Sequence, residues 1–62
     1  MFKYYRLPLL DAQRRLALEF RIEPAQLARE VRPGVFRVLP EKVPAFLSAT
    51  REFGEAVEVT PC

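Results

Sequence analysis

Six prolines divide this chain of 62 residues into short segments, and they limit the elements that it can form. Proline lacks a backbone N–H and fixes its own φ, so a helix or a central strand ends where it occurs, except in the first turn of a helix. Pro8, Pro40 and Pro61 each close a segment with the composition of a strand, whereas Pro24 and Pro44 stand where a helix can begin. The sequence therefore predicts several short elements rather than one or two long ones.

The predicted strands cover residues 2–7, 35–39 and 56–60. The first alternates, which places Phe2 and Tyr4 on one face, predicted to be core, and Tyr5 on the other face, predicted to meet a partner subunit. The second strand is almost wholly apolar, with Arg37 as its one charged residue, and we expect it to be the most buried.

The predicted helices cover residues 12–22, 24–32 and 43–53. Asp11 is a suitable N-cap for the first, in which Leu16 and Phe20 belong to an apolar stripe that recurs every four residues. Leu18 falls on the opposite side of that helix, either as an ordinary exposed leucine or as the centre of an interface. The third helix is amphipathic and ends at Gly54.

These elements predict one small α+β domain over residues 1–62, in the order β-α-α-β-α-β. We expect two layers, with a three-stranded mixed or parallel sheet and the helices mainly on one face. Strands 35–39 and 56–60 are expected to pair in parallel, because a helix connects them.

Self-association follows from the small size of the chain. A core of this size nearly balances the entropy of ordering and usually needs an additional constraint. Cys62 is the one cysteine and histidine is absent, so an internal disulfide and the usual zinc ligand sets are excluded. We therefore expect a homodimer, with Tyr5 and Leu18 as candidate interface residues.

Composition bounds the class of protein and its compartment. Arginine outnumbers lysine eight to two and asparagine is absent, a thermophile-like profile typical of heat-resistant proteins and of GC-rich bacterial or archaeal coding. Apolar runs are too short for a signal peptide or a membrane span, so we expect a cytoplasmic protein without a membrane partner. Residues 1–37 carry a net charge of +4 and residues 38–62 carry −2. This asymmetry fits an anionic partner for the basic half, a solvated surface, or two halves that attract each other in a dimer.

The usual catalytic constellations are missing. Without histidine, Ser48 and Cys62 lack the common base that activates a nucleophile. Gly34 and Gly54 stand alone, so a glycine-rich phosphate loop is absent. The sequence predicts no enzyme, no catalytic residue, no cofactor and no metal site.

Residues 14–32 resemble a bacterial helix-turn-helix motif in the spacing of their apolar positions, which include Leu16, Phe20 and Leu27. The motif usually has glycine in its turn, where this chain has Arg21. The resemblance implies DNA contacts by Arg14, Arg15, Arg21, Gln26, Arg29 and Arg32, the first three near phosphates and the others in the major groove. The alternative is that residues 24–32 form a second core helix.

Two hypotheses about function follow. The leading one is a small non-enzymatic interaction or regulatory module that binds through an open sheet face or through a stripe of Arg14, Leu18 and Arg21. The second is a nucleic-acid-binding protein that uses either the helix-turn-helix-like segment or the aromatic strand. In that strand, Phe2, Tyr4 and Tyr5, beside Lys3 and Arg6, are suited to stack on unpaired bases.

Overall fold

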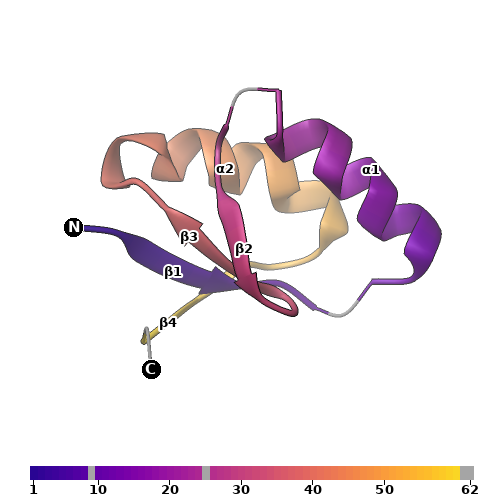
Figure 1. Ribbon diagram of the computed structural model, residues 1–62, viewed down its shortest axis with the longest axis horizontal. Coiled ribbons are helices and arrows are strands. Elements are labelled where there is room, and N and C mark those ends of the chain that lie inside the picture. Colours follow the sequence, from indigo (N-terminus) through magenta and orange to yellow (C-terminus); the bar gives the residue numbers. More distant parts are fainter. Residues whose placement is uncertain (9, 25, 61–62) are drawn as a thin grey trace.

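The computed structural model describes residues 1–8, 10–24 and 26–60. Its elements are β1 (Lys3–Arg6), α1 (Ala12–Ile22), β2 (Arg29–Arg32), β3 (Val35–Val38), the 3₁₀ turn η1 (Pro40–Lys42), α2 (Val43–Thr50), the 3₁₀ turn η2 (Arg51–Phe53) and β4 (Val57–Val59) (Figure 1). The α+β class is confirmed, as are the first helix and the helical segment that ends at Gly54. The predicted order is wrong, because the structure has the order β-α-β-β-α-β.

The sheet has four strands in the order β2-β3-β1-β4, and every neighbouring pair is antiparallel. The predicted three-stranded sheet is therefore wrong. The predicted parallel pair is also wrong, because β1 lies between β3 and β4 and pairs with both. β3 and β4 still run in the same direction, as a helical crossover requires. This is the connectivity of a split β-α-β, or ferredoxin-like, sheet.

The segment expected to form a second helix instead ends α1 and begins a hairpin. The N–H of Leu27 donates to the carbonyl of Ile22 at 3.0 Å, and the N–H of Gln26 donates to the carbonyl of Glu23 at 3.0 Å. These are the two bonds of a Schellman closure, and Gln26 has the positive φ of 49° that such a closure places after a helix. The chain thus reverses at Gln26 and continues as a strand.

A two-residue loop, Pro33-Gly34, connects β2 to β3. Gly34 has a φ of 80°, the value that a Pro-Gly turn of type II requires at its second central residue. The Pro-Gly pair therefore joins two strands and does not follow the helix that was predicted over residues 24–32.

Both helices cover one face of the sheet, and the core residues are buried between the helices and that face. The ring of Phe46 on α2 is fully buried, with its centroid 5.8 Å from that of Tyr5 and 6.1 Å from that of Phe36. From α1, Leu18 and Ile22 complete this core. Both candidate interface residues, Tyr5 and Leu18, are buried in the core of their own chain, so their predicted surface role is wrong.

The orientation of α1 explains why Leu18 is buried. The carboxylate of Asp11 caps the helix, as predicted, by accepting the N–H of Arg14 at 2.8 Å. Two apolar stripes run along α1, and their spacing alone does not show which one faces the sheet. Leu16 and Phe20 are exposed, at 53% and 72%, whereas the stripe of Leu18 packs inward.

Neither α-helix of the described residues has the length and hydrophobicity that a membrane span requires.

Candidate functional site

The face of the sheet opposite the helices carries aromatic and arginine side chains. Residues directly opposite each other on antiparallel strands point to the same side. The register therefore gives two rows across all four strands, Val59-Tyr4-Arg37-Arg29 and Val57-Arg6-Val35-Arg32, with Phe2 next to the first row at the start of β1. These nine residues form the open face of the sheet. A β-bulge after Glu30 shifts the register by one residue at Arg32.

Three arginines of the helical layer have partners within the chain. Arg14 donates from Nη2 to the carbonyl of Glu52 at 3.2 Å, and Arg21 forms a salt bridge with the carboxylate of Glu52 while lying 5.9 Å from the centre of the Phe53 ring. These contacts join α1 to the end of the second helical segment. Both guanidinium groups are therefore engaged in contacts within the chain.

Arg15 and Glu30 form the third such contact, between α1 and β2. The second oxygen of the Glu30 carboxylate accepts the N–H of Gly34 at 2.9 Å, so one side chain connects the helix, the strand and the hairpin loop. Burial alone would raise the pKa of Glu30, but the hydrogen bonds from Arg15 and Gly34 and the charge of Arg15 together lower that pKa below its usual value. The hydrogen bond and the charge of Glu30 raise the pKa of Arg15.

Arginines of the open face have a different environment. Within the described part of the chain, Arg6, Arg29 and Arg32 form no salt bridge and no cation–π contact. Arg37 lies over the ring of Phe2, with its guanidinium carbon 4.2 Å from the ring centre. Phe2 is 40% exposed and Tyr4 is half-buried, so both rings contribute surface to this face.

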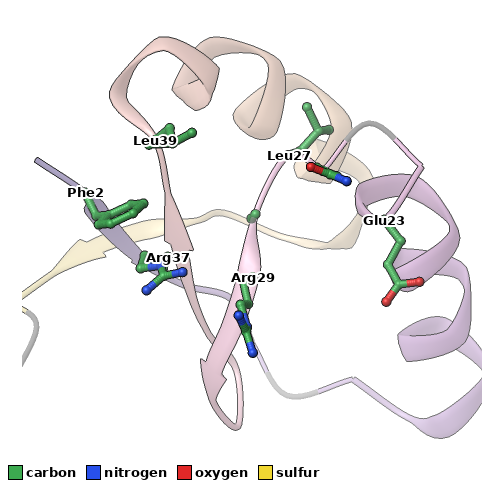
Figure 2. A pocket seen from close by; sticks show the side chains of 8 residues that line it. Phe2, Glu23, Leu27, Arg29, Arg37 and Leu39 are labelled. Atoms are coloured by element: carbon green, nitrogen blue, oxygen red, sulfur yellow. The ribbon is translucent and has the colours of Figure 1, made fainter.

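One end of the open face leads into a pocket of about 530 Å³. Phe2, Arg29 and Arg37 line it from the sheet, and Figure 2 shows the two arginines on neighbouring strands. Its other walls include Glu23 at the end of α1 and Leu39 after β3. A hydrogen bond of 3.0 Å from the Lys42 ammonium to the Gln26 carbonyl links the two loops beside it.

The structure separates the six predicted nucleic-acid contacts. Arg29 and Arg32 lie in β2 rather than on a helix, and Gln26 lies in the turn and lines the pocket. The recognition helix of the helix-turn-helix interpretation is therefore wrong. Arg14, Arg15 and Arg21 lie in the helical layer, away from the open face.

Sequence reasoning missed two features of this site. Phe2 and Tyr4 were expected to be core, but they lie on the open face, although their shared side of the strand is confirmed. Arg37 was not proposed for any contact. As the one charged residue of an apolar strand that alternates in the sheet, it was the signal that this strand has a face without a covering helix.

No protein-family model, curated protein or solved structure matches this chain. Among the described residues, no cluster of three or more acidic, histidine or cysteine side chains is placed to hold a metal ion.

Proposed function

We propose that this protein is a small non-enzymatic binding module that holds single-stranded nucleic acid on the open face. The observation that carries the proposal is the row Tyr4-Arg37-Arg29, flanked by Phe2, which places aromatic rings beside two guanidinium groups on neighbouring strands. Bases of an unpaired strand stack on exposed aromatic rings and guanidinium planes, and arginines bind the phosphates between them.

The charge of the open face supports an anionic partner. Four of the eight arginines of the chain lie there, and the register places no carboxylate in either row. Glu58 of β4 pairs with Tyr5 and therefore belongs to the helix-covered side, where its carboxylate contacts the Lys3 ammonium at 3.3 Å. A polyanion thus meets uncompensated positive charge on this face.

The shape of the open face favours a single strand over a duplex. The major groove of B-DNA is about 12 Å wide and admits a helix or a two-stranded ribbon. Four strands spaced about 4.8 Å apart are too wide to enter it. A flat sheet instead presents its surface to bases that are already unpaired.

The proposal is tested by fluorescence anisotropy of a labelled single strand and a labelled duplex at low and moderate salt. We expect saturable binding that favours the single strand and weakens as salt rises. Each arginine that contacts a phosphate adds about 0.7 to the slope of log affinity against log salt, so Arg6→Gln with Arg29→Gln should lower that slope by roughly 1.4.

Arg51→Gln is the matched control, because it removes the same charge from the helical layer at an exposed position. It should leave the slope unchanged. Flat anisotropy at low salt would contradict the nucleic-acid proposal and would leave a protein as the partner of the open face.

A further inference from the structure

Arg29 and Arg37 occupy directly opposite positions on β2 and β3, where the register pairs them. Side chains in such pairs have Cβ atoms about 4.5–5.5 Å apart, and like charges placed there repel each other. In the helical layer, by contrast, a carboxylate lies against an arginine, as between Glu30 and Arg15. Here the two guanidinium groups face the same pocket, and within the described residues neither has a carboxylate partner.

From this pair we infer that the pocket binds the terminal phosphate of a nucleotide, with the attached nucleoside against its other walls. The inference rests on the proposed function, of which it specifies one end of the bound strand. A terminal phosphate carries about two negative charges near neutral pH, where an internal phosphodiester carries one, and it has three oxygens that accept hydrogen bonds. Two guanidinium groups supply matching donors in the planar geometry that phosphate favours.

The other walls of the pocket suit a nucleoside better than a bare anion. Phe2 and Leu39 contribute apolar surface, and Glu23 and Gln26 contribute an acceptor and an amide group that can pair with the edge of a base. The volume of about 530 Å³ lies within the range of about 300–1,000 Å³ typical of small-ligand pockets. The contact between Arg37 and Phe2 fixes one guanidinium before binding, which reduces the entropy lost when the phosphate arrives.

The test is a competition experiment with the whole chain. Unlabelled short oligothymidylates that carry a 5′-phosphate, a 3′-phosphate or hydroxyl groups at both ends displace an internally labelled oligothymidylate. We expect one of the two phosphorylated strands to compete on the order of tenfold better than the hydroxyl strand, the effect of about one charge-assisted hydrogen bond. Equal competition by all three strands would overturn the inference and leave the proposed function intact.

Two variants locate the effect. Arg29→Gln should abolish the preference for the phosphorylated strand, measured as the ratio of its affinity to that of the hydroxyl strand. Arg6→Gln removes the same charge from the second row of the open face and should preserve that ratio. A ratio that falls equally in both variants would show a general charge effect and would overturn the inference.

A second arm separates a strand end from a free mononucleotide. Thymidine monophosphate, thymidine and inorganic phosphate are titrated separately, and binding is followed by NMR chemical shifts. If oligonucleotides do not bind but thymidine monophosphate binds more tightly than either fragment in an Arg29-dependent manner, the proposed function fails and the pocket is a mononucleotide site. If none of the three binds and no strand shows a phosphate preference, the inference is wrong.

Discussion

The helix-covered face and the open face of the sheet both depend on arginine, but the neighbours of these arginines differ. In the helical layer, Arg15 and Arg21 form salt bridges with Glu30 and Glu52 that connect α1 to the sheet and to η2. On the open face, Arg37 lies over an aromatic ring and faces Arg29 across the strands.

The role of each of these arginines depends on where the carboxylates are placed. Chain halves of net charge +4 and −2 suggested an anionic partner for the basic half, a solvated surface, or two halves that attract each other in a dimer. The fold instead uses glutamates from both halves to neutralise one layer. Six arginines form no salt bridge within the described residues, and four of them lie on the open face: Arg6, Arg29, Arg32 and Arg37.

The largest difference between the two faces is expected in stability. Phe46→Ala removes a fully buried ring from the covered side and should lower the free energy of unfolding by about 3–5 kcal/mol. Phe2→Ala removes a ring from the open face and one exposed cation–π contact, a loss of about 1 kcal/mol or less. Urea denaturation followed by circular dichroism measures both, and similar losses would contradict the assignment of the two faces.

Binding should show the next largest effect. Tyr4→Ala removes a stacking surface beside Arg37 and should weaken the binding of single-stranded DNA by about 1–3 kcal/mol. Tyr4→Phe keeps the ring and should retain most of the affinity. Anisotropy titrations give both values, and an unchanged affinity for Tyr4→Ala in a folded protein would remove stacking from the proposed function.

A smaller effect is expected at the salt bridge between Arg15 of α1 and Glu30 of β2. Glu30→Gln should destabilise the protein by about 1 kcal/mol at neutral pH, because it removes a partly exposed charge-assisted contact. The pKa of Glu30 is lowered in the folded state, so its contribution is complete above the unfolded carboxyl pKa of about 4.3 and is lost as the pH falls through the folded value.

Urea denaturation of Glu30→Gln and of the parent at neutral pH and near pH 3 measures this effect. The gap between the two proteins should narrow at the lower pH. Glu41→Gln, at an exposed position of η1, is the matched control and should change stability by less than about 0.5 kcal/mol. A gap that is the same at both pH values would show that the charge of Glu30 does not contribute.

The smallest effect on stability concerns the homodimer that we propose from the size of the chain. Tyr5 and Leu18 are buried and cannot contact a second copy of the chain. We expect that copy to pack against Leu16 and Phe20, the large exposed apolar side chains of α1. Phe20→Gln should change the stability of the monomer by less than about 0.5 kcal/mol and should abolish self-association in sedimentation velocity. A parent protein that sediments as a monomer at all concentrations would contradict the homodimer.

Local sequence signals were sufficient for several elements of this protein. The cap at Asp11, the helix that follows it and the helical segment ending at Gly54 each depend on contacts within a few residues, so the sequence predicted them correctly. Alternation along β1 likewise predicted that Phe2 and Tyr4 share a face. Periodicity shows that two sides of a strand differ, but it does not show which side another element covers.

The remaining features depend on contacts between residues that are far apart in the sequence. Residues 29–32 are compatible with either a helix or a strand, and pairing with β3 across the Pro33-Gly34 turn selects the strand. The two apolar stripes of α1 were distinguished by packing against the sheet, where Leu18 and Ile22 join the buried core. The open face exists because β1 is inserted between β3 and β4 while both helices cover the opposite side. That long-range pairing is not contained in any local pattern of the sequence.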